Sequence, residues 1–252
     1  MEINELLDFT TEVGECLLSS GAETGRVEDT LTRIVRYFYK GHSEILVVLT
    51  GFFVNIGAYT ETVRVRKRTI NLDTIARINM LSRDIVEGRT NFDSAVKRLA
   101  EIKKCKPYPV WIKTPAVAVS CGLFTLLSDG GWADALNSLI VGAIMNLIIN
   151  ILESRGVTNF IVTFLGGAII AVLTVLIYTA GLGTSINAMI TGAIMPLVPG
   201  LAITNALRDI IDGDYLSGGA RLFDAVVVAV ALAAGAGMVM YFFGYMSGGI
   251  LK

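Results

Sequence analysis

Charge is spread very unevenly along this chain of 252 residues, and that distribution is the feature that most limits its fold. Residues 1–113 contain 17 Lys/Arg and 15 Asp/Glu, whereas residues 114–252 contain only 4 and 7. The net charge of -1 therefore combines +2 in the first region with -3 in the second. The second region consists of long apolar runs separated by short turns, a pattern typical of membrane-spanning helices.

Five of these apolar runs predict spanning helices, at residues 110–127, 132–152, 158–180, 186–203 and 222–246. Each contains at least eighteen residues, which at a rise of 1.5 Å per residue is enough to cross about 30 Å of hydrocarbon. Many transporters are built from paired repeats, but the five runs show no repeat. We therefore predict a five-helix membrane domain at 108–252. The second of two paired repeats would then lie on another chain.

Residues 1–107 have the composition and periodicity of a small α+β domain. Apolar residues recur at helical spacing within 6–17 and 27–38, and again within 72–85 and 92–102. Residues 45–59 are rich in β-branched and aromatic types and predict two buried strands. Residues 63–66 alternate with a period of two, as a half-exposed strand does.

Basic residues near the predicted spans set the orientation. The turns 128–131 and 181–185 contain no Lys or Arg, whereas Arg155, Arg208 and Arg221 all fall on the opposite side. Because Lys and Arg are enriched in cytoplasmic loops, we expect a multi-pass plasma-membrane protein whose amino-terminal domain is cytoplasmic. Five spans then place the carboxyl terminus, Lys252, outside.

The fourth span contains two prolines and a glycine, Pro196, Pro199 and Gly200, within five residues. Proline cannot donate to the carbonyl one turn earlier, so the helix is expected to kink or break here. One interpretation is a half-helix whose amino terminus binds an anionic substrate group. The other is a kink that only shapes packing.

A polar segment follows this span directly. Asn205, Arg208, Asp209 and Asp212 are spaced to share one helical face, where a guanidinium could pair with internal carboxylates or bind a substrate carboxylate. The alternative is a solvated loop with ordinary ion pairs, and the spacing alone does not separate the two.

Further polar side chains lie within the other spans. Asn146, Asn150 and Glu153 form one stripe of the second span, and Asp224 lies one turn inside the fifth. Such residues usually face the bundle interior and often line a substrate path. Asn side chains also join helices by hydrogen bonds, so packing is the favoured interpretation for Asn146 and Asn150.

Several function classes are disfavoured. The only histidine is His42, the three cysteines show no CxxC spacing, and the chain has neither a GxSxG motif nor a P-loop. We therefore expect no enzyme, metal, cofactor or nucleic-acid partner. Transport driven by an ion gradient remains open, and its candidate proton carriers are Glu153, Asp209, Asp212 and Asp224.

Two motifs resemble the threonine/serine exporter family. One is the sequence GAETGRVEDT at 21–30, and the other is MPLVPG at 195–200 with seven residues that follow it: Asn205, Arg208, Asp209, Gly213, Asp214, Ser217 and Gly218. Full-length family members resemble fusions with a second, smaller membrane unit. This chain is similar to the larger subunit of the split branch, whose bacterial relatives are associated with succinate export.

The resemblance implies a small separate membrane subunit, an oligomeric assembly in the lipid bilayer, and a substrate that is either a hydroxy amino acid or a C4 dicarboxylate. Both substrates carry a carboxylate. The substrate-binding candidates are then Pro196, Pro199, Gly200, Asn205, Arg208, Asn146 and Asn150. Two competing hypotheses remain: a cytoplasmic sensor or hydrolase domain anchored by the spans, and a channel without ion coupling.

Overall fold

The computed structural model describes residues 2–105 and 108–246. The described residues divide into two compact units. The first contains those of Met1–Pro107 together with Leu201–Phe223, and the second contains those of Tyr108–Gly200 together with Asp224–Lys252. Residues 201–223, which the sequence analysis assigned to the membrane domain, thus pack with the amino-terminal unit. The predicted position of Lys252 falls outside the described residues.

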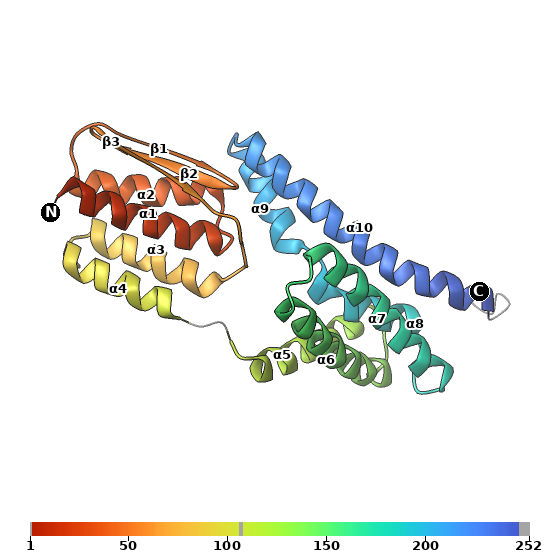
Figure 1. Ribbon diagram of the computed structural model, residues 1–252. Helices are drawn as coiled ribbons and strands as arrows, with labels where there is room; N and C mark the ends of the chain where they lie inside the picture. The colour runs from red at the N-terminus through yellow and green to blue at the C-terminus, as the bar shows by residue number, and fades with distance from the viewer. Residues whose placement is uncertain (1, 106–107, 247–252) are drawn as a thin grey trace. The chain divides into compact units, whose positions relative to one another are not determined.

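The first unit stacks a sheet and four helices in three layers (Figure 1). Before residue 107 its helices are α1 (Ile3–Ser19), α2 (Thr24–Phe38), α3 (Leu72–Val86) and α4 (Phe92–Lys104), and its strands are β1 (Ser43–Val48), β2 (Gly51–Ile56) and β3 (Tyr59–Arg64). The strands form an antiparallel sheet in the order β1-β2-β3, which packs against α1 and α2. The other sides of α1 and α2 contact α3.

The core of this unit lies between the sheet and the helices. Phe52 and Ile56 of β2 are fully buried, together with Leu17 and Leu31 from the helices. The prediction of two buried strands was wrong in one respect, because Leu46 and Phe53 are about half exposed on the open face of the sheet. The third strand was placed too late: it ends at Arg64, beyond which only the Val65 N–H still donates to Thr50.

The second unit consists of apolar helices: α5 (Val110–Leu127), α6 (Trp132–Ser154), α7 (Asn159–Thr179), α8 (Ile186–Ile194), the short 3-10 helix η1 (Met195–Leu197) and most of α10 (Tyr215–Met246). The bounds of the first three helices agree with those of the first three apolar runs to within two residues at each end. In the described part of the chain four helices are long and apolar enough to cross a membrane, or five if the broken fourth is counted as one.

The fourth predicted span is not one continuous helix. After η1 the backbone is extended at Val198, and a new helix, α9 (Gly200–Ile211), begins two residues later. The break expected from Pro196 and Pro199 is therefore present. The helix of the fifth predicted span, α10, begins seven residues before its predicted start, because its first two turns include Ser217, two glycines and Arg221 and do not form an apolar run.

A buried carboxylate fixes one end of the second unit. Asp134, in the first turn of α6, is fully buried and accepts hydrogen bonds from the N–H groups of Gly131, Thr184 and Ser185 and from the Thr184 hydroxyl, at 2.6–3.2 Å. Thr184 and Ser185 lie just before α8. Asp134 therefore ties the start of α8 to the start of α6, a role that the sequence analysis did not assign.

Two glycines bring α7 and α10 into backbone contact. A Cβ atom on Gly235 would overlap the carbonyl oxygen of Phe164, and one on Gly167 would overlap that of Leu232. These glycines let the two helices approach closely, as small residues do where membrane helices pack.

We therefore expect Gly235→Ala to destabilise the protein by about 1–3 kcal/mol, because the overlapping atoms are backbone and the helices must separate. Gly237→Ala is the matched control, since nothing lies within 4 Å of a Cβ at that residue of the same helix. Thermal unfolding in detergent compares the two. Equal melting temperatures for both variants would contradict the close contact.

Candidate functional site

A sharp turn between α1 and α2 forms one side of the candidate site. Gly21 has a φ of +81°, a conformation that glycine adopts without strain. The N–H groups of Gly21 and Ala22 donate to the carbonyls of Leu18 and Leu17, a Schellman motif that ends α1. The chain then enters α2 at Thr24. Residues 21–24, the start of the GAETG sequence, are thereby held in one fixed conformation.

The hairpin formed by α9 and the start of α10 forms the other side of the candidate site. Its turn passes through Gly213, whose φ is +93°, and the Asp214 N–H donates back to the Asp209 carbonyl at 2.8 Å. Gly218 packs directly on α9, because a Cβ there would lie 2.8 Å from the Ala206 carbonyl oxygen. Both halves of the hairpin belong to the first unit.

Thr24 joins the turn to the hairpin through two carboxylates. Its backbone N–H and its hydroxyl lie 3.3 and 3.1 Å from Asp209 Oδ1, and the same hydroxyl lies 2.7 Å from Asp214 Oδ2. A hydroxyl has a single hydrogen to donate. The shorter contact indicates that Asp214 receives it, while Asp209 is held by the N–H.

Asp209 and Arg221 form a buried ion pair at the centre of the site. The side chain of Asp209 is 1% exposed and that of Arg221 is 9% exposed, and Arg221 Nε lies 3.2 Å from Asp209 Oδ2. Arg221 also donates to the Ala22 carbonyl at 3.2 Å. The Arg221 guanidinium therefore neutralises the Asp209 carboxylate of α9 and also provides a hydrogen-bond donor for the Ala22 carbonyl of the turn.

Two further contacts lie at the edge of the site. Arg208 pairs with Glu23, and Asn205 donates to the Gly21 carbonyl at 3.3 Å. Arg26 lies 3.9 Å from the other oxygen of Glu23. Of the two roles considered for Arg208, the structure shows pairing with an internal carboxylate. We call the set of Glu23, Thr24, Asp209, Asp214, Arg208 and Arg221 the polar cluster.

The polar cluster is electrically balanced, with three carboxylates and three guanidiniums when Arg26 is included. Burial alone would raise the pKa of Asp214, but hydrogen bonds from Thr24 and Ser217 outweigh it and hold that pKa below its usual value. Every charge has an internal partner. This arrangement suits a structural connection between the turn and the hairpin better than a substrate site.

The lowered pKa of Asp214 predicts a pH dependence. A carboxyl whose pKa is lower in the folded protein stabilises it fully above the unfolded value of about 4, and that contribution is lost as the pH falls through the folded pKa. We expect Asp214→Asn to lower the melting temperature near neutral pH and to converge on the unmodified protein on acidification. Asp8→Asn, on the exposed face of α1, is the control and should change little. If Asp214→Asn lowered the melting temperature by the same amount in acid as at neutral pH, the lowered pKa of Asp214 would be contradicted.

The remaining candidates lie elsewhere. Asn146 is buried and donates to the Thr114 hydroxyl at 2.8 Å, and Asn150 donates to the Asn146 carbonyl at 2.6 Å. These contacts are within the second unit and fit the packing interpretation. Glu153 is exposed at the end of α6, and Asp212 is exposed at the end of α9. Asp224 belongs to the second unit, unlike Asp209 and Asp212.

Three residues of the polar cluster were not predicted from the sequence: Thr24, Asp214 and Arg221. Both motifs that contain or adjoin them were recognised, but Thr24 and Asp209 are 185 residues apart. No periodic pattern links residues at such a separation. The available signal was the presence of Thr24 in one motif and of Asp214 in the other.

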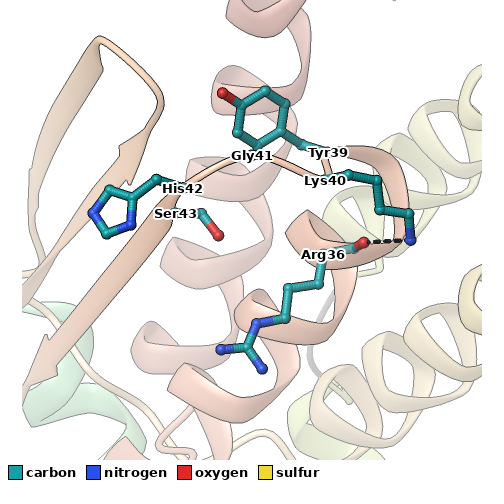
Figure 2. A pocket seen from close by; sticks show the side chains of 6 residues that line it. All are labelled: Arg36, Tyr39, Lys40, Gly41, His42 and Ser43. Atoms are coloured by element: carbon teal, nitrogen blue, oxygen red, sulfur yellow. Dashed lines mark hydrogen bonds between the residues drawn. The ribbon is translucent and has the colours of Figure 1, made fainter.

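A hollow at the end of α2 lies apart from this cluster. Figure 2 shows the residues that line it, which are Arg36, Tyr39, Lys40, Gly41, His42 and Ser43. The Lys40 ammonium group donates to the Arg36 carbonyl at 3.0 Å, and the His42 ring points away from both. These side chains diverge, so they do not form a convergent binding site.

The apolar helices and the broken fourth span define a multi-pass α-helical membrane protein. Residues 8–243 match the model of a family described as putative threonine/serine exporter. The chain belongs to this family, which is a family of transporters and not of enzymes.

Individual relatives fall into two groups. The chain is 23% identical, over 93% of its length, to a probable threonine/serine exporter of Mycobacterium tuberculosis, and 23% identical, over 94%, to a threonine/serine exporter of Corynebacterium glutamicum. It spans about half of those proteins, 46% and 51%. It is 25% identical, over 92% of its length, to a probable succinate transporter subunit, YjjP, of Escherichia coli, and spans 93% of it. No solved structure matches the chain significantly.

Proposed function

We propose that this protein is one subunit of an exporter that carries a small carboxylate-bearing metabolite, of the threonine/serine or succinate type, across the plasma membrane. The observation that carries the proposal is the break in the fourth span, in a chain matched by the exporter family from residue 8 to residue 243. The names of the relatives supply both substrate types, and each of these substrates carries a carboxylate.

The break lies inside the helical bundle of the second unit. A Cβ on Gly166 of α7 would lie 2.8 Å from Leu197 Cδ1, so η1 packs at this level of α7. Gly166 is seven residues, or about 10 Å, from the start of α7. Irregular backbone at such a depth is stable only when protein covers it or when it lines a water-filled cavity. This placement supports a role for Pro196, Pro199 and Gly200 in shaping the substrate path.

The hairpin extends this proposal to the amino-terminal unit. Helix α9 follows the break directly, and Asn205, Arg208 and Asp209 hold it against residues 21–24. We propose that this unit is cytoplasmic and that it fixes the position of α9. We also propose that an ion gradient drives export. The candidate proton carriers are Asp209, Asp212, Asp224 and Glu153.

The lengths of the relatives support a second subunit. The chain spans half of each exporter but nearly all of a protein named as a transporter subunit. We propose that a small separate membrane protein of the same family supplies what the longer relatives contain in their other half.

Reconstitution tests these proposals. Vesicles containing both chains should move labelled threonine, serine or succinate, and vesicles with either chain alone should not. Dissipating the proton gradient with a protonophore should stop a coupled carrier and spare a channel. Binding of a metabolite by the amino-terminal unit, without flux through both chains together, would refute the exporter proposal.

A further inference from the structure

The segment from the last residue of β3 to the first residue of α3 carries the densest positive charge of the first unit. Arg64, Arg66, Lys67 and Arg68 are all exposed and occupy four of five successive residues, and no acidic residue occurs from 62 to 72. We call residues 64–72 the basic loop. The basic loop therefore contains no carboxylate that would repel an anionic group.

The backbone of the basic loop is anchored at both ends. The Val65 N–H donates to Thr50 at 2.9 Å, and the N–H groups of Thr69 and Asn71 donate to Ser19 and Ser20 at 2.8 and 3.0 Å. The Asn71 side chain then caps α3. The loop is therefore held in one conformation, in which Val65 is buried and the four cationic side chains are exposed.

Two large apolar side chains accompany these cations. Ile70 and Leu72 are each 59% exposed. They line one small hollow together with Leu201, from the start of α9, and with the ion-paired side chains of Glu23 and Arg26. Exposed aliphatic side chains beside a cluster of Lys and Arg are the combination that binds the interface of an anionic bilayer, where the apolar groups insert and the cations meet headgroups.

The chain connection limits how far Leu201 can lie from the core of the membrane unit. Leu197 packs against the core of the membrane unit, and Leu201 follows it by four residues, a separation of at most about 14 Å. Leu201 shares its hollow with Ile70 and Leu72. We propose that the basic loop binds the anionic headgroups of the surrounding membrane and thereby holds the amino-terminal unit against the bilayer surface. This inference does not depend on the identity of the exported substrate.

A fluorescence experiment on the full chain in lipid nanodiscs tests the proposal. Thr69→Cys, labelled with an environment-sensitive dye, reports on the basic loop. Ser94→Cys carries the same dye at the start of α4, which follows the end of α3 that is farther from the loop. Cys105 is exposed and Cys16 is partly buried, so both are first replaced by serine, whereas Cys121 is buried. Nitroxide on the lipid headgroups should quench the Thr69 label strongly in discs containing phosphatidylglycerol, more weakly in phosphatidylcholine discs, and the Ser94 label in neither.

Matched charge variants complete the test. Arg66→Gln with Lys67→Gln should reduce quenching in the anionic discs several-fold, because each cation near an anionic surface strengthens binding. Arg36→Gln with Lys40→Gln removes the same charge from the hollow of Figure 2 and should leave quenching unchanged. Equal quenching in both lipids, no quenching in either, or an equal loss for both double variants would overturn the proposal.

Discussion

Arg221→Ala is expected to destabilise the first unit by about 3–5 kcal/mol and to abolish export, because it leaves Asp209 as an uncompensated charge in a buried site. The substitution also removes the hydrogen bond to the Ala22 carbonyl. Loss of both contacts should release the hairpin from residues 21–24. Thermal unfolding and limited proteolysis within 201–223 measure the structural effect, and efflux from vesicles measures the functional one.

Arg208→Ala is the matched control, since Arg208 is also an arginine paired with a carboxylate of this cluster but its side chain is 50% exposed. An exposed ion pair contributes about 1 kcal/mol or less, so its loss should leave the hairpin docked. Replacing both Asp209 and Arg221 by leucine should recover much of the stability, because no isolated charge remains. An Arg221 variant no less stable than the Arg208 variant would contradict a buried pair.

Arg208→Ala also separates the two roles considered for this residue. If Arg208 acts only through Glu23, export should persist close to its normal rate. Loss of export in a stable Arg208 variant would instead assign the guanidinium to the substrate.

The membrane helices could be predicted from the sequence because their cause is local. An apolar run of eighteen residues or more that enters a bilayer must form a helix, because its backbone N–H and C=O groups can then hydrogen-bond to one another. The break after Pro196 is equally local, since a missing N–H and a clashing ring act on the same turn. Both features required only the residues of the segment itself.

The polar cluster could not be predicted in the same way, because its cause is an encounter between distant segments. Asp209 and Asp212 are both acidic residues near the end of α9, yet one is buried against Thr24 and the other is exposed. Hydropathy treats them identically. Only the docking of the hairpin on residues 21–24 distinguishes them, and that docking also explains why polar residues such as Ser217 and Arg221 continue a helix upstream of its apolar part.

The buried asparagine of α6 illustrates a different limit. The stripe of Asn146 and Asn150 allowed two interpretations, and both amides form hydrogen bonds inside the second unit. Spacing along one helix indicates which side chains share a face. It does not say whether the partner across that face is a substrate or, as for Asn146, the hydroxyl of Thr114.

Replacing both Pro196 and Pro199 by alanine is expected to reduce export at least about tenfold while the protein still folds. Alanine restores the two missing N–H donors and favours a continuous helix by roughly 3 kcal/mol per proline, so α8 and α9 should merge. A continuous helix would remove the extended residue at Val198 and the free amino end of α9. Efflux measures the function, and circular dichroism measures the added helix.

Pro115→Ala provides the control for this change, because Pro115 lies within the unbroken helix α5. It restores one N–H without joining two helices, and export should stay close to its normal rate. The comparison separates the effect of proline removal in a membrane helix from the effect of closing the break. Export that survives in the double variant at the rate of the Pro115 variant would mean that the break only shapes packing, and the substrate path would then have to be sought elsewhere in the bundle.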